Sequence, residues 1–143
     1  MEQLPGTYAL ILRAQEAHEV PVGRLGRLEV QPGWYVYVGS AFGPGGLRAR
    51  VGRHLRGTGA LHWHIDYLRR ATIVEEVWYS LDPTPREHEW AQAFMCLPAV
   101  AVPLAGFGSS GCQCPAHLFY LVNKEALDLL NLQNSRKLKV KTT

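Results

Sequence analysis

The sequence predicts an α+β domain in which helices flank a small mixed or antiparallel β-sheet. Two strand patterns precede the first helix pattern, and helix and strand patterns alternate after it. The chain has 143 residues, of which 47% are hydrophobic and 19% are charged, as in an ordinary globular domain and unlike a disordered chain. We therefore expect a single domain over residues 1–132, followed by a loose basic tail over residues 133–143.

Three strands and one helix are predicted in the first half of the chain. Runs rich in β-branched and aromatic residues, bounded by Gly and Pro turn signals, predict strands over residues 7–12, 24–30 and 34–39. A glycine-rich loop then leads into a helix over residues 47–56. In that helix Leu47, Val51 and Leu55 recur every four residues, so we expect them to form its apolar, inward-facing stripe.

Five further elements are predicted in the second half by the same criteria. They are a short helix over 62–70, a strand over 71–80, a helix over 84–96, a strand over 118–122 and a helix over 124–132. No apolar run approaches the ~20 residues of a membrane span. The N-terminal residues also lack the pattern of a signal peptide. We therefore expect no membrane association and a cytoplasmic location.

Positive charge is concentrated in two segments of a chain whose net charge is +3. No acidic residue occurs between Glu29 and Asp66, an interval that holds three histidines and four arginines. The arginines are Arg48, Arg50, Arg53 and Arg56. The second segment contains Arg136, Lys137, Lys139 and Lys141. Such segments favour phosphate binding, although a solvated helix face and a frayed tail would leave the same pattern.

Arg50 and His54 lie one turn apart on the predicted helix, at the edge of its apolar stripe. A guanidinium in that half-buried position suits a phosphate, because it is planar, permanently charged and bidentate. A surface ion pair is the alternative for Arg50. No acidic residue lies within helical reach of it, which makes that alternative weaker.

Three tyrosines lie on the strands predicted in the first half of the chain. Tyr35 and Tyr37 share one face of their strand, and Tyr8 can join Tyr37 if the two strands pair in the right register. Taken alone, such tyrosines are equally well explained by packing.

Glu87 is the most informative carboxylate in the sequence. It shares a helix face with Trp90, Ala91 and Phe94, which are expected to pack inward. A carboxylate on that face needs a partner, since an unpaired buried charge is costly. Thr84 and Glu87 also match a capping box, with Thr84 as the N-cap, and the two roles can coexist.

The three cysteines are too few for a secreted disulfide framework. Cys112, Cys114 and His117 could supply three ligands of a structural zinc ion, although their spacing lacks the usual two-residue gap between paired cysteines. Cys96, His62 or His64 would then supply the fourth ligand. Reduced, partly buried thiols are the alternative.

Three short segments, taken in order, resemble the GIY-YIG nuclease superfamily. They are Gly6-Thr7-Tyr8, Tyr37-Val38-Gly39 and Leu47-Arg48-Ala49-Arg50-Val51. Longer strings resemble its Uri-type branch, long described as a domain of unknown function, over nearly the whole chain. They are residues 32–47, 62–68 and 106–110, together with the cysteine segment. Gly111 departs from that branch, which often has Asp before the first cysteine.

The resemblance implies hydrolysis of DNA phosphodiester bonds with one Mg²⁺ or Mn²⁺ ion, in DNA repair or processing. Its catalytic set falls on Tyr8, Tyr37, Arg50, His54 and Glu87, with Glu87 as the metal ligand and Tyr8 or His54 as the base. The residues expected to contact DNA, branched or single-stranded, are Arg48, Arg53, Arg56, His62 and His64. For His62 and His64, packing at a polar helix start is an equal alternative. A non-cleaving nucleic-acid-binding module and a zinc-stabilised interaction domain are the rival functions.

Overall fold

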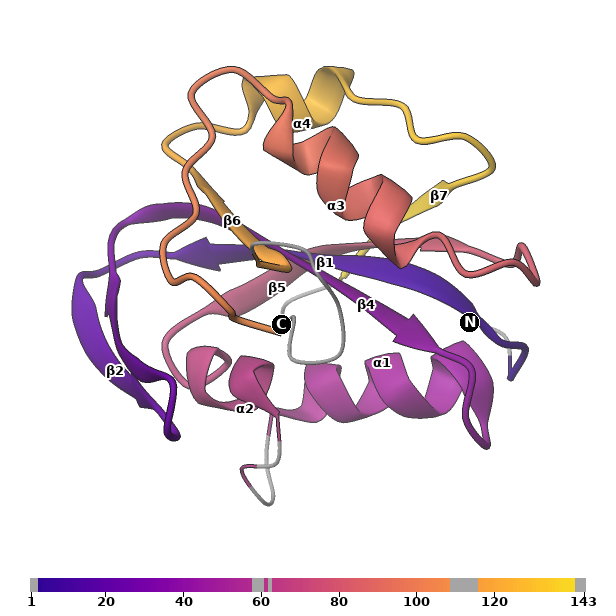
Figure 1. Cartoon of the computed structure of the whole chain (residues 1–143), viewed down its shortest axis with the longest axis horizontal. Helices are drawn as coiled ribbons and strands as arrows, with labels where there is room; N and C mark the ends of the chain where they lie inside the picture. Colours follow the sequence, from indigo (N-terminus) through magenta and orange to yellow (C-terminus); the bar gives the residue numbers. More distant parts are fainter. Residues whose placement is uncertain (1–2, 58–60, 62, 109–115, 141–143) are drawn as a thin grey trace.

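A computed structural model describes residues 3–57, 61, 63–108 and 116–140. Its core is a five-stranded sheet in the order β6-β4-β1-β5-β7, and each recorded pair of neighbours is antiparallel (Figure 1). The strands are β1 (Gly6–Ala14), β4 (Gly33–Ala41), β5 (Ile73–Ser80), β6 (Leu118–Leu121) and β7 (Arg136–Lys139). The predicted fold class is confirmed.

Helices cover both faces of this sheet, in two pairs (Figure 1). The helices α1 (Gly46–Arg56) and α2 (His64–Leu68) lie on one face, and α3 (Glu87–Met95) and α4 (Glu125–Leu129) on the other. The central strand β1 is therefore buried on both sides. This explains its nearly continuous apolar run, where a strand with one exposed face would alternate.

A separate hairpin joins β2 (His18–Val22) to β3 (Gly26–Val30). The sequence prediction placed a strand over residues 24–30 and missed β2. The polar and proline residues of β2 hide its alternation, in which only Val20 and Val22 are buried. The turn contains Gly23 and Gly26 at positive φ, which glycine adopts without steric cost.

The C-terminal segment was expected to be a loose tail, and the structure corrects this for residues 136–139. These residues form β7, which pairs with β5. Two contacts anchor it: the Lys137 ammonium lies 4.1 Å from the centroid of the Trp78 ring, and the Val140 N–H donates to the Glu75 carbonyl. A run of basic residues is typical of an exposed sheet edge as well as of a tail, and the charge pattern does not distinguish them.

Among the described residues, no helix is long and apolar enough to cross a membrane.

A buried ion pair on the α3 face joins β5 to α4. Glu76 is only 5% exposed, pairs with the Lys124 ammonium and accepts a hydrogen bond from Trp78 Nε1 at 3.2 Å. Lys124 also contacts Asp128, at 3.1 Å, on the exposed side of the helix. The pair at Glu76 is enclosed and the pair at Asp128 is solvated.

We predict that Lys124→Ala lowers the free energy of unfolding by about 3 kcal/mol, because it leaves the buried Glu76 carboxylate without its cation. Asp128→Ala is the matched control. It removes the exposed partner of the same lysine and should cost about 0.5 kcal/mol or less. Urea unfolding of both variants measures the difference, and equal losses would contradict the assignment.

Candidate active site

The site lies at the end of the sheet where β4 finishes and β1 begins. The strand β6 pairs with β4 from Trp34 to Tyr37, and the Val38 N–H then donates to the His117 carbonyl. Gly39 to Ala41 pair with the first residues of β1.

The phenols of Tyr8 and Tyr37 lie on the α1 face, with ring centroids 6.4 Å apart. Strand register brings them together, because Tyr8 is opposite Gly39 and Tyr37 is opposite Leu10. The Tyr8 hydroxyl is 2.7 Å from Nε2 of His54, and both side chains are buried. A tyrosine from β1 and a histidine from α1 thus satisfy each other inside the core.

Gly39 makes room for the Tyr8 ring. A Cβ atom at Gly39 would lie 2.5 Å from both the hydroxyl oxygen and Cζ of Tyr8, which is well inside contact distance. The ring can therefore rest on β4 only because residue 39 has no side chain.

The buried phenols and imidazole remain uncharged at neutral pH. Burial raises the pKa of Tyr8 well above its ordinary value, the nearby Tyr37 adds to this, and Arg50 opposes it. Burial also raises the pKa of Tyr37, and the negative charge of Glu87 raises it further. The pKa of His54 is lowered from 6.5 to about 4, mainly by burial, which outweighs the opposing effect of Asp66.

The helix α1 is rotated relative to the sequence prediction. Leu55, expected on the inward stripe with Leu47 and Val51, is 38% exposed, while His54 is 1% exposed. The correction has a clear reason: the Tyr8 hydroxyl is a partner that makes burying the imidazole favourable. Arg50, one turn before His54, stays half-buried and donates to the Ser40 carbonyl at 3.3 Å.

Two arginines of α1 stack against one tryptophan. The guanidinium carbons of Arg50 and Arg53 lie 4.4 and 4.2 Å from the Trp63 ring centroid. Arg53 also forms a bidentate pair with Asp66, at 2.8 and 3.0 Å, and Asp66 accepts the Trp63 N–H at 2.8 Å. This network fixes the two guanidiniums. The expected DNA-contact residues Arg48 and Arg56 are exposed on the same helix.

Glu87 reaches the same end of the sheet from the α3 face. Its carboxylate accepts a hydrogen bond from Ser40 Oγ at 3.2 Å and lies 3.1 Å from Nδ1 of His117. Its side chain is 23% exposed, so one side of the carboxylate faces solvent. His117, which the sequence analysis considered as a zinc ligand, faces Glu87.

The predicted capping box is wrong. The helix α3 begins at Glu87 itself, its N-cap is Arg86, and no side chain caps it. Thr84 lies outside the helix, because the Arg86 N–H donates to Oγ1 of Thr7 and so ties the helix start to β1. The Glu87 carboxylate is therefore directed to Ser40 and His117 and does not close its own helix end.

Ser40 connects the two halves of the site and was missed by the sequence analysis. Its carbonyl accepts from Arg50 on one face of the sheet, and its hydroxyl donates to Glu87 on the other. Its place directly after the Tyr-Val-Gly segment is the signal that could have identified it. The negative charge of Glu87 raises the pKa values of both Tyr8 and Tyr37.

The loop before β6 packs beside Tyr37. Phe107 is fully buried, with its ring 6.1 Å from that of Tyr37 and 5.4 Å from that of His64. The Gly108 N–H donates to Nδ1 of His64 at 2.8 Å, so this expected DNA-contact residue holds the loop in place.

Three of the sequence-predicted ligands, His62, Cys112 and Cys114, lie outside the described residues, and the zinc hypothesis stays a prediction. Within the described ranges no group of three or more His, Cys, Asp or Glu side chains could hold a metal ion.

Fold and site together define an α+β domain with a buried tyrosine–histidine pair beside an arginine and a carboxylate. Residues 7–139 match the family described as Domain of unknown function DUF123, and the chain belongs to that family. No curated protein and no solved structure matched the chain.

We predict that the free energy of unfolding falls by up to about 3 kcal/mol between pH 7 and pH 4 because of His54 alone. Its pKa is about 4 when folded and 6.5 when exposed, so the unfolded chain binds more protons in this window and stability is lost as the pH falls. Urea unfolding at several pH values should show a shallower dependence for His54→Gln. His18→Gln is the control, because it changes an exposed histidine on β2 and leaves His54 in place. Its free energy of unfolding should fall with pH as steeply as that of the wild type. Identical profiles for wild type and His54→Gln would contradict the prediction.

We also predict that Gly39→Ala lowers the free energy of unfolding by about 1–3 kcal/mol, because the new methyl group would overlap the buried Tyr8 ring. Gly43→Ala is the control, since a Cβ there meets nothing within 4 Å. Denaturant unfolding of the two variants provides the comparison. A Gly39→Ala protein as stable as Gly43→Ala would show that the ring is free to move.

Proposed function

We propose that this protein is a divalent-metal-dependent endonuclease of the GIY-YIG type, which hydrolyses phosphodiester bonds in DNA. One observation carries the proposal: two phenols, an imidazole, a guanidinium and a carboxylate from β1, β4, α1 and α3 meet at one end of the sheet, linked through Ser40. These are the residue types, at the matching positions, that the resemblance to the superfamily implies.

Arg50 would bind the scissile phosphate. Its guanidinium is held from two sides, by the Trp63 ring and by the Ser40 carbonyl, and it retains donors for a phosphate oxygen. Because the side chain is already ordered, less conformational entropy is lost when the phosphate binds. Charge that develops on the phosphate oxygens would be stabilised by the same group.

Tyr8 would orient the attacking water. His54 is unprotonated at neutral pH, so its Nε2 can accept the Tyr8 hydroxyl proton across the 2.7 Å contact. The Tyr8 oxygen also accepts a hydrogen bond from Arg50, so one lone pair would remain for a water molecule. A histidine with a pKa near 4 is a weak base at pH 7, which favours Tyr8 over His54 as the group in contact with water. Tyr37, 6.4 Å from Tyr8 between ring centroids, would bind the phosphate or the water from the other side.

Glu87 would hold the metal ion. Magnesium needs only one or two carboxylates and keeps several water ligands, so one partly exposed carboxylate fits it. The contacts with Ser40 and His117 orient the carboxylate and leave oxygen lone pairs for a cation. An ion bound there would supply Lewis-acid stabilisation of the phosphate.

We predict that Glu87→Ala and Arg50→Ala each reduce DNA cleavage by at least about 100-fold, because each removes a group that stabilises charge on the phosphate. Glu89→Ala is the matched control, since Glu89 is on the same helix with its carboxylate 66% exposed. Cleavage is measured on branched, single-stranded and damaged DNA with Mg²⁺ or Mn²⁺, and with EDTA as the metal-free control. Thermal melts verify that each variant folds.

Two outcomes would contradict the proposal. Wild-type protein that cuts none of these substrates with either metal is not a nuclease of this type, and DNA binding without cutting would favour a non-cleaving module. Cleavage that survives Glu87→Ala would place the chemistry elsewhere in the chain.

A further inference from the structure

One cross-strand row runs from the candidate active site to the far edge of the sheet. Gly39 on β4 is opposite Tyr8 on β1, Tyr8 is opposite Tyr79 on β5, and Tyr79 is opposite Arg136 on β7. Residues directly opposite each other in a sheet project from the same face. Tyr8, Tyr79 and Arg136 therefore share the α1 face, and Arg136 is two strands away from Tyr8.

The spacing of the strands sets the distance between Tyr8 and Arg136. Neighbouring strands lie about 4.8 Å apart, so the backbone of Arg136 is about 10 Å from that of Tyr8. The helix α1 packs on β1 and β4, at the other end of this row. Tyr79 is half-buried and Arg136 is exposed, so side-chain surface is available along the row.

Because successive side chains of a strand point to opposite faces of the sheet, the basic side chains of β7 lie on different faces. Arg136 and Leu138 are opposite Tyr79 and Val77, whose side chains belong to the α1-face core. Lys137 is opposite Trp78, in the core on the other face, and its ammonium donates to the carbonyls of α4 and the following residue, Leu127 and Leu130. Lys139 is opposite Glu76, on that same other face. Of these three cations, only Arg136 is on the Tyr8 side.

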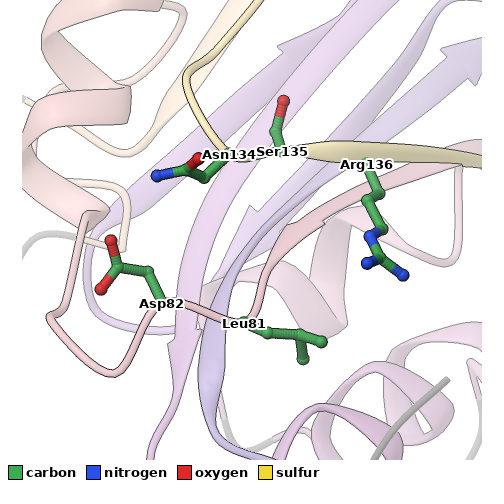
Figure 2. A pocket seen from close by; sticks show the side chains of 5 residues that line it. All are labelled: Leu81, Asp82, Asn134, Ser135 and Arg136. Atoms are coloured by element: carbon green, nitrogen blue, oxygen red, sulfur yellow. The ribbon is translucent and has the colours of Figure 1, made fainter.

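Arg136 borders a hollow of about 390 Å³ at the ends of β5 and β7, drawn in Figure 2. The other lining residues are Leu81, Asp82, Asn134 and Ser135. In Figure 2 the guanidinium extends away from Asp82, on the side where Leu81 lies. Asp82 is engaged by Arg86 through two contacts of 2.8 and 3.1 Å, so its charge is largely offset. Within the described ranges, Arg136 forms no ion pair of its own.

We propose that Arg136 binds a backbone phosphate of the DNA strand, one or two nucleotides away from the phosphate held at Tyr8 and Arg50. The separation follows from the row: successive phosphates of one strand lie farther apart in space than the axial rise of about 3.4 Å per nucleotide, so about 10 Å spans only one or two phosphate steps. Tyr79 lies between the two positions and offers an aromatic ring beneath the intervening nucleotides. This inference rests on the proposed function, since it specifies the path of the same substrate.

Binding is tested without metal, in EDTA, so that cleavage cannot interfere. Arg136→Ala should weaken the binding of a 20-nucleotide DNA about fivefold at low salt and reduce the slope of log K against log salt by about 0.7 to 0.9, the value of one phosphate contact. Lys139→Ala is the matched control, because it removes the same charge from the same strand on the opposite face. Its loss of DNA affinity and its change in salt slope should each be at most a third of those of Arg136→Ala. Arg136→Lys keeps the charge and should restore most of the salt slope.

A length series tests the position of the contact. DNA substrates that extend zero to six nucleotides on either side of a single cleavage position are compared in wild type and Arg136→Ala. The binding penalty of Arg136→Ala should appear once the extension on one side reaches about one or two nucleotides, and should stay constant for longer extensions. A penalty that is independent of length would overturn the proposed path.

The outcomes separate this inference from the proposed function. If DNA binds through Arg136 but is never cut, the contact stands and the nuclease proposal fails. If DNA is cut and Arg136→Ala binds like Lys139→Ala, the nuclease proposal stands and the Arg136 contact is refuted. Equal losses in both alanine variants indicate general charge attraction and also refute it. A wild-type protein that binds no DNA refutes both.

Discussion

The hydrogen bond between Tyr8 and His54 is the constraint on which the candidate site depends. Two polar side chains inside a core must satisfy each other, since each would otherwise lose its hydrogen bonds to water without replacement. The 2.7 Å contact therefore fixes how α1 is rotated on the sheet, with His54 inside and Leu55 outside. That rotation in turn aims Arg50, one turn earlier, at the Ser40 carbonyl. The same bond requires Gly39, because the Tyr8 ring occupies the space of its missing side chain.

The second constraint is the position of Ser40 at the end of β4, where groups from both faces of the sheet meet. The negative charge of the Glu87 carboxylate, from the α3 face, raises the pKa values of Tyr8 and Tyr37, which belong to the α1 face. Ser40 makes the connection, with its carbonyl and its hydroxyl engaged on different faces. The site therefore depends on a residue whose backbone and side chain act on opposite faces of the sheet.

The sequence predicted the central strands and α1 well, because their apolar runs are long and bounded by Gly and Pro. It failed where the decisive partner is distant in the chain. Burial of His54 depends on Tyr8, 46 residues away. Likewise, the direction of the Glu87 side chain depends on Ser40, 47 residues away, and a local capping box was the wrong explanation. The β7 strand was hidden for a related reason, since its pairing with β5 is a property of the sheet edge and not of its own composition.

The positive charges illustrate the same difference between sequence and structure. The four arginines of α1 form one cluster in the sequence, yet they meet different environments. Arg53 is paired with Asp66, and Arg48 and Arg56 face solvent. Arg50 is held by an aromatic ring and a carbonyl, neither of which carries a negative charge, so its guanidinium keeps its full positive charge while its position is fixed. A cation that is both ordered and uncompensated attracts an anion more strongly than a mobile or paired one, since neither side-chain entropy nor an existing ion pair has to be given up. Under the proposed function, the position of this arginine beside the neutral phenols, more than the net charge of the chain, would make this end of the sheet selective for phosphate.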